Sequence, residues 1–161
     1  MTTQRQFIIF TLKDEEFGID VDDVREILKL PKIHSLPQSL GFIEGVINLR
    51  KHIVAVIDLR KRLGIETASH SEKSRILIVK VKDIVVGLIV DVVLEIISVS
   101  SEFIEPPPQI VTPQISAKYI QGISRVKERV IVFLDVKELL TSKNIGELVK
   151  ANRRIPDSSN Q

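Results

Sequence analysis

The stretch "GVINLRKHIVAVIDLR" at residues 45–60 decides the fold, because a near copy, "GISRVKERVIVFLDVK", follows at residues 122–137. Each copy begins with a glycine and has a charged pair at its centre, and a run of apolar residues that ends at an aspartate follows. An upstream pair of stretches repeats as well. Residues 6–30, "QFIIFTLKDEEFGIDVDDVREILKL", align without a gap with residues 75–99, "RILIVKVKDIVVGLIVDVVLEIISV". The chain therefore contains a duplicated unit of roughly 70 residues.

The two pairs of stretches are not equally spaced along the chain. The offset is 69 residues for the upstream pair and 77 for the downstream pair. The second unit therefore contains eight extra residues, and the segment "SSEFIEPPP" at residues 100–108 can supply them.

Each unit consists of short runs rich in valine and isoleucine, which favour β-strands. Lys-Asp pairs at residues 13–14 and 82–83 each separate two such runs and predict hairpin turns, and Arg50-Lys51 separates two more. We predict five strands per unit and ten in all. The runs are apolar almost without interruption, so many strands are covered on both faces. Two small closed five-stranded barrels with a shared apolar interface account for this pattern, since closure removes exposed strand edges.

The composition restricts the class of protein. Of the 161 residues 43% are apolar and none is cysteine, which excludes a disulfide framework and a thiolate metal site. No run of about 18 apolar residues occurs, so no segment is expected to enter a membrane. The net charge is +2. We interpret the basic spots at residues 60–63 and 153–154 as solvated surface charge, and we expect a cytoplasmic protein without a nucleic-acid partner.

Few helices are predicted. Single turns are expected at residues 22–26 and 116–120, and the one long helical pattern covers residues 135–154. We predict one domain, residues 1–150, made of two β-barrel subdomains. These cover about 15–70 and 71–140, with the N-terminal strand and the C-terminal segment crossing over. Residues 151–161 are expected to be a flexible tail.

No arrangement typical of catalysis or of a metal site is present in the sequence. His34, His52 and His70 lie at no ligand spacing from one another or from carboxylates. The acidic run at residues 20–23 lacks the glycine and the length of a calcium loop. No phosphate-binding glycine loop or nucleophile elbow occurs. We therefore expect no enzyme activity, no metal and no cofactor.

The repeat separates residues that serve the fold from residues free to serve a partner. Both units have to fold, so residues identical in both are expected to be structural. These are the pairs Gly18 and Gly87, Gly45 and Gly122, and Asp58 and Asp135, the two aspartates as caps of the turn after a strand. Residues that differ can contact a partner. Asn48 against Arg125 and Arg50 against Lys127 belong to this class.

Four stretches together resemble the CheW-like chemotaxis coupling proteins: "GVINLRKHIVAVIDLR", "VGLIVDVVLEI", "FIEPPP" and "YIQGIS". The resemblance runs in order from about Gln6 to Leu140. It implies two intertwined five-stranded SH3-like barrels, in agreement with the repeat. It also implies a non-catalytic adaptor that links chemoreceptors to the regulatory domain of a chemotaxis histidine kinase. The adaptor would be recruited to membrane-associated receptor arrays, and we expect it to be monomeric on its own.

The resemblance further assigns a receptor-binding site. Val24 and Glu26 of "VREI", Asn48 and Arg50 of "NLR", and Val92 match positions of receptor contact in the family. They would line a groove between the barrels that takes the helical tip of a receptor. The repeat argument gives Glu26 and Val24 a structural role instead, because both residues recur in the second unit. The two arguments disagree for these positions.

The sequence departs from the family pattern next to Arg50. Lys51 stands where the family has glycine, and Ala55 where it has proline. If the turn requires a positive φ at residue 51, lysine costs roughly 1 kcal/mol there.

Three other functions agree with the sequence. The protein could couple a pilus-motility or other chemosensory pathway, which genomic neighbours would reveal. It could be the regulatory domain of a kinase, although no ATP-binding segment is present. It could bind a small molecule between the barrels, although aromatic residues are few, at 4%.

Overall fold

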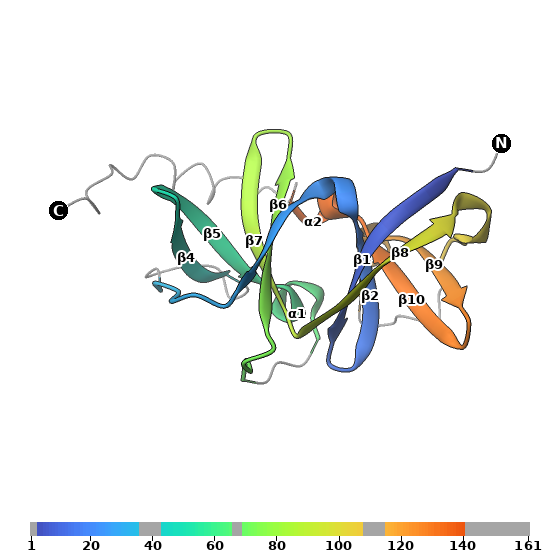
Figure 1. Cartoon of the computed structure of the whole chain (residues 1–161), viewed down its shortest axis with the longest axis horizontal. Coiled ribbons are helices and arrows are strands. Elements are labelled where there is room, and N and C mark those ends of the chain that lie inside the picture. The colour runs from blue at the N-terminus through green and yellow to red at the C-terminus, as the bar shows by residue number, and fades with distance from the viewer. Residues whose placement is uncertain (1–2, 36–42, 66–68, 108–114, 141–161) are drawn as a thin grey trace.

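The computed structural model describes residues 3–35, 43–65, 69–107 and 115–140. Figure 1 shows two twisted β-sheets side by side, with two short α-helices near the middle of the molecule. The elements in chain order are β1 (Gln4–Leu12), β2 (Glu15–Asp20), the 3-10 turn η1 (Val21–Asp23), β3 (Val24–Lys29), β4 (Ile43–Leu49), β5 (His52–Asp58), α1 (Leu59–Leu63), β6 (Arg75–Val81), β7 (Ile84–Val90), β8 (Val92–Ser100), η2 (Ser101–Phe103), η3 (Ala117–Tyr119), β9 (Ile120–Val126), β10 (Arg129–Leu134) and α2 (Val136–Leu140).

The strands form two five-stranded mixed sheets, as the repeat predicts. Sheet A has the order β8-β1-β2-β10-β9, and sheet B the order β3-β6-β7-β5-β4. Each sheet combines the first hairpin of one repeat unit with the three later strands of the other unit, so the units are intertwined. Each sheet contains strands from both of the ranges 15–70 and 71–140. Strand pairing therefore does not separate the chain at residue 70, and the division into these two subdomains stays a prediction.

In both sheets, the chain that follows one edge strand returns to the opposite edge strand. His34, after β3, exchanges two backbone hydrogen bonds with Val46 of β4, both 2.8 Å long. Glu105, after β8, exchanges two with Ile123 of β9, at 2.8 and 2.7 Å. Val46 and Ile123 are equivalent in the repeat, so His34 and Glu105 are equivalent too. Their offset of 71 places two of the eight extra residues before Glu105 and six after it. Barrel closure itself stays a prediction.

The repeated glycines lie where two parts of the chain approach closely. Gly45 has a φ of +150°, and a Cβ there would lie 2.1 Å from the carbonyl oxygen of His34. A Cβ at Gly122 would lie 2.4 Å from Cγ2 of Ile104. Both glycines therefore leave room for the segment that bridges the two edges of a sheet. Gly18 and Gly87 leave room for side chains, since a Cβ would come within 2.8 Å of Phe133 Cδ1 and 2.7 Å of Ile76 Cγ2, respectively.

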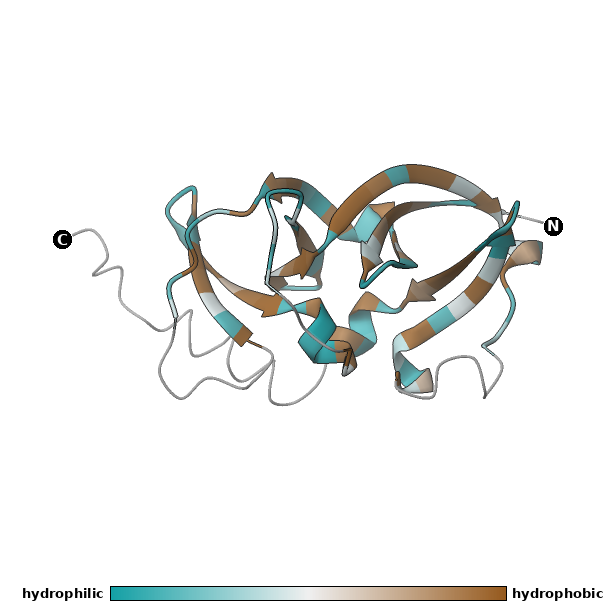
Figure 2. Cartoon of the chain, turned by 90° about the horizontal axis from the view of Figure 1, so that it is seen from below, coloured by the Kyte–Doolittle hydropathy of each residue, from teal (hydrophilic) through white to brown (hydrophobic). Residues whose placement is uncertain are grey.

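Alternate residues of the central strands enter different cores. In β6, Ile76 and Ile78 point into core B, inside sheet B, whereas Leu77 and Val79 point into a core shared by the two sheets. In β10, alternation between core A, inside sheet A, and the shared core follows the same pattern. Figure 2 shows the resulting apolar bands along the strands. Burial on both faces explains why the sequence runs are apolar without polar alternation.

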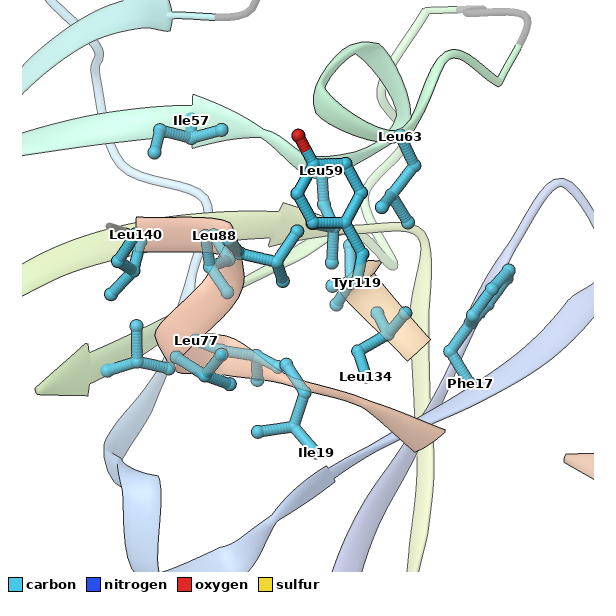
Figure 3. Packing of buried hydrophobic residues seen from close by; sticks show 14 of the residues in the cluster. Phe17, Ile19, Ile57, Leu59, Leu63, Leu77, Leu88, Tyr119, Leu134 and Leu140 are labelled. Atoms are coloured by element: carbon cyan, nitrogen blue, oxygen red, sulfur yellow. The ribbon is translucent and has the colours of Figure 1, made fainter. Parts of the chain in front are cut away.

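The shared core holds the two sheets together. Figure 3 shows side chains from both sheets and both helices meeting there: Phe17, Ile19 and Leu134 from sheet A, Ile57, Leu77 and Leu88 from sheet B, and Leu59, Leu63 and Leu140 from the helices. Fully burying one such side chain contributes about 1.5–3 kcal/mol. A 70-residue unit alone would lack this core.

The expected turn at residues 116–120 is present as η3, and the one expected at 22–26 is present as η1, which begins one residue earlier and ends three residues earlier, where β3 begins. The expected long helix begins with α2, and its predicted continuation to residue 154 lies outside the described residues, as does the tail. Helix α1 was not predicted. Asp58 Oδ1 accepts a hydrogen bond from Arg60 N at 3.0 Å, and Asp135 Oδ1 accepts one from Glu138 N at 3.2 Å. Each aspartate therefore caps the helix that follows its strand.

Candidate functional site

An exposed ion pair lies at one end of sheet B. The Arg50 guanidinium donates two hydrogen bonds to the Glu26 carboxylate, from Nη1 to Oε2 at 2.5 Å and from Nη2 to Oε1 at 3.0 Å. The Arg50 side chain is 73% exposed and that of Glu26 is 24% exposed. The hydrogen bonds from Arg50 to Glu26 raise the pKa of the guanidinium, so the arginine stays charged. Residues from two separate segments are thus brought together as a fixed, solvent-facing fork.

The backbone of the turn between β4 and β5 positions Arg50. Arg50 has a φ of 49° and Lys51 a φ of 72°, so both central residues adopt the left-handed conformation. Such turns match the twist of the flanking strands, and they favour Asn-Gly or Asp-Gly over two long side chains. The turn therefore does require a positive φ at residue 51, where the sequence has lysine. Asn48, two residues before Arg50, is exposed on β4.

Glu26 occupies the end of the interior side of sheet B. It pairs across the strands with Ile78, whose side chain lies in core B, and Leu28 two residues later packs against the same core. The carboxylate therefore caps the apolar interior, and Arg50 covers it from the turn. Glu26 therefore both covers the end of the apolar core and holds the exposed side chain of Arg50.

Sheet A has an equivalent ion pair with a different geometry. Glu95, the counterpart of Glu26, accepts a hydrogen bond from Arg129 Nη1 at 2.9 Å, and Glu16 accepts from Arg129 Nη2 at 2.5 Å. The side chain of Arg129 is 30% exposed, against 73% for Arg50. These contacts raise the pKa of Arg129, with the hydrogen bond to Glu16 as the main cause. The repetition of the glutamate thus reflects a common capping role, and of these two arginines Arg50 is the one whose guanidinium is mostly exposed to solvent.

Val24 and Val92 lie where the chain passes from one sheet to the other. Val24 begins β3, is half-buried and packs against the shared core, as does Val93 at the equivalent position of β8. Val92, also half-buried, pairs with Thr11 of β1. The structure therefore unites Glu26 and Arg50 directly, places Asn48 nearby on β4, and places the two valines at the two crossovers.

One polar cluster is not predicted by the sequence pattern. The basic run at residues 60–63 predicts solvated surface charge, but Arg60 is 4% exposed. Its Nε lies 3.4 Å from Asp91 Oδ1 and 3.8 Å from Asp58 Oδ1, and its Nη2 lies 3.2 Å from His70 Nδ1. Asp91 Oδ2 in turn accepts from Lys13 N at 2.7 Å. The cluster therefore connects α1, which follows β5 of sheet B, with the turn between β1 and β2 of sheet A. An arginine is tolerated there because charged partners surround it.

His70, which has no ligand spacing to a carboxylate in the sequence, lies close to one in space. Its Nε2 is 3.6 Å from Asp58 Oδ2. Within the described residues, no group of three or more His, Asp and Glu side chains could hold a metal ion. No helix in the described part of the chain is both long and apolar enough to cross a membrane.

The fold and the site define a duplicated β protein of two intertwined sheets, with an exposed arginine–carboxylate pair at the end of one sheet. Comparison with known proteins gives the family. A model of the CheW-like domain matches residues 6–144, and the chain belongs to the CheW-like family.

Individual relatives support this assignment. The chain is 34% identical over 149 residues to the chemotaxis protein CheW of Treponema pallidum, with 90% of this chain and 87% of that protein covered. It is 33% identical over 145 residues to CheW of Klebsiella aerogenes, with the same shares covered. The crystal structure of the scaffolding protein TtCheW from Thermoanaerobacter tengcongensis matches with a TM-score of 0.80 at 37% identity. That match covers 88% of this chain and 91% of TtCheW.

Proposed function

We propose that this chain is a non-catalytic adaptor that couples chemoreceptors to a chemotaxis histidine kinase. The observation that carries the proposal is the match of the CheW-like domain over residues 6–144 together with the exposed Arg50–Glu26 pair. The pair lies at positions that the family resemblance assigns to receptor contact. Localisation in the cytoplasm, at receptor arrays, follows from this function and is part of the proposal.

The receptor site of the proposal consists of Glu26, Asn48 and Arg50 at the end of sheet B, with Val24 and Val92 at the crossovers. An arginine has five N–H donors, and Glu26 accepts from two of the Arg50 nitrogens. The remaining donors can bind acidic or carbonyl oxygens of a receptor helix. Glu26 fixes the guanidinium before binding, which lowers the entropy lost when the complex forms.

The kinase contact requires a separate surface, so that receptor and kinase bind at the same time. The proposed partner is the regulatory domain of the kinase, and the apolar ends of the sheets near the hairpin turns at residues 13–14 and 82–83 are the expected region. Single contacts of this kind are modest in affinity, and the many copies in an array strengthen them.

A binding assay with purified components tests the proposal. A receptor cytoplasmic fragment and the kinase regulatory domain are each titrated against wild type, Arg50→Ala, Arg50→Lys and Arg125→Ala. Arg125 is exposed on β9 at the position equivalent to Asn48, which makes it a matched control. We expect both Arg50 variants to weaken receptor binding. Alanine removes the donors, and the single ammonium of lysine cannot form the bidentate hydrogen bonds of a planar guanidinium. Arg125→Ala should bind like wild type.

The assay also separates the two parts of the proposal. If wild type binds the kinase domain while Arg50→Ala binds the receptor normally, the adaptor function stands and the assigned site is wrong. If folded wild type binds neither partner, the adaptor function itself is wrong.

A further inference from the structure

The two edge strands that the repeat makes equivalent, β3 and β8, carry different outward side chains. Each is the first strand of its sheet in the orders given above. The three outward, exposed positions of β3 are Arg25, Ile27 and Lys29, and those of β8 are Leu94, Ile96 and Ser98. One copy of this edge therefore has a cation on each side of its isoleucine, and the other has none.

Exposed edge strands are normally protected, because their free backbone groups can pair with another chain. Lysine and arginine on the outward face are a common form of protection, and β3 has both. On β8, Leu94 is 45% exposed and Ile96 57% exposed. Glu95, the one charged residue within β8, is bound by Arg129 on the interior side of sheet A. Among the described strands, β8 pairs with β1 and with no strand on its other side. Both edge strands have a bulge at the equivalent residue, Leu94 in β8 and Arg25 in β3, so β8 differs from β3 in lacking the outward cations.

Against the expectation of a monomer drawn from the family resemblance, we propose that two copies of this chain associate through β8, with the two strands antiparallel and edge to edge. If Ile96 lies opposite Ile96 of the second copy, Leu94 lies opposite Ser98 and Glu95 opposite Ile97. No carboxylate then faces a carboxylate, and the apolar side chains meet in the middle. The same pairing of β3 would place Arg25 opposite Lys29 twice, and directly opposed like charges destabilise a strand pair. Self-complementarity is thus a property of β8 and not of β3.

The repeat supplies the variants that test this interface. Leu94→Arg with Ser98→Lys gives β8 the residues that β3 already carries at the equivalent positions, so the fold should tolerate them. Val130→Lys is the matched control, because Val130 is an apolar residue with 50% exposure on β10, which β1 and β2 separate from β8 in the order of sheet A. Circular dichroism verifies that each variant is folded. Sedimentation velocity over an approximately hundredfold concentration range measures the weight-average mass.

We expect the mass of wild type to rise with concentration toward that of a dimer. The Leu94→Arg/Ser98→Lys variant should need at least about tenfold higher concentration for the same mass, since two cation pairs replace apolar contacts. Val130→Lys should behave like wild type. The reverse exchange, Arg25→Leu with Lys29→Ser, should give species larger than a dimer, because both edges can then pair.

Two outcomes overturn the proposal: a wild type that stays monomeric over the whole range, and an association that the β8 variant leaves unchanged. Receptor and kinase binding need not change in either case, so the result is independent of the adaptor function.

Discussion

Replacing Gly45 by alanine should destabilise the protein through the segment that bridges the two edges of sheet B. The new Cβ would lie 2.1 Å from the His34 carbonyl oxygen, a backbone atom that moves only with its whole segment. The φ of +150° adds strain for any residue with a side chain. The bridge between His34 and Val46 consists of two backbone hydrogen bonds, both 2.8 Å long, which the displacement would break.

The magnitude follows from these terms. A backbone held in a region that is essentially restricted to glycine costs about 1–3 kcal/mol for another residue, and two hydrogen bonds contribute about 0.5–1.5 kcal/mol each. The expected loss in the free energy of unfolding is about 2–6 kcal/mol, a large part of the 5–15 kcal/mol typical of a domain. Urea unfolding measures this loss, and hydrogen exchange at the amides of His34 and Val46 reports whether the bridge opens.

Gly64→Ala is the matched control for backbone strain. Gly64 ends α1 with a φ of 77° and is exposed, so alanine there should cost about 1–2 kcal/mol from conformation alone. If Gly45→Ala costs no more than Gly64→Ala, and both amides stay protected, the close approach to His34 does not explain the glycine at this position.

Three further substitutions test other features of the structure. Lys51→Gly should stabilise the protein by about 1 kcal/mol in urea unfolding, because glycine adopts the observed φ of 72° without the steric cost that lysine has; an equal or lower stability would contradict this account of the turn. Ser124 has a buried hydroxyl without a hydrogen-bond partner among the described residues, at the position equivalent to Ile47 in core B. Ser124→Ala should raise the free energy of unfolding by about 1 kcal/mol, and a clear loss would show that the hydroxyl is satisfied in solution. Burial, followed by repulsion from Asp20, raises the pKa of Asp23 in the folded state. Between the unfolded and the folded pKa the folded state binds more protons, so this carboxyl costs stability as the pH rises through that window, and the cost persists at neutral pH. Asp23→Asn should therefore be more stable than wild type at pH 7 and lose this advantage in acid, whereas an advantage that is independent of pH would exclude the titration as its cause.

The repeat allowed most of the fold to be predicted from the sequence. Ten strands, five to a sheet, followed from the duplicated runs, and burial on both faces followed from the absence of polar alternation. The exchange of hairpins between the units could not be derived from these runs. The first hairpin of a unit could complete a five-stranded sheet with the later strands of its own unit or with those of the other unit. The strands of the two units are alike, so their sequences do not distinguish these two arrangements. The family resemblance provided the intertwining.

The burial of Arg60 was missed for a related reason. "LRKRL" at residues 59–63 contains three cations in five positions and is too short for a helical period, so it resembles solvated surface. The carboxylate of Asp91 and the ring of His70, which accommodate Arg60, come from other parts of the chain. Sequence patterns report local periodicity, and a buried charge is decided by partners that local periodicity does not contain.

The two units pair an equivalent glutamate with an arginine in different ways. Both units place a glutamate, Glu26 or Glu95, at the end of a sheet interior, and both neutralise it with an arginine. In sheet A that arginine is Arg129, on the strand, where it is shared by two carboxylates and is mostly covered. In sheet B the equivalent strand position is His52, and the arginine stands two residues earlier, in the turn. The arginine in the turn still pairs with the carboxylate, while its side chain is 73% exposed against 30% for Arg129. The capping interaction is therefore present in both units, and the unit with its arginine in the turn presents more of the guanidinium to solvent.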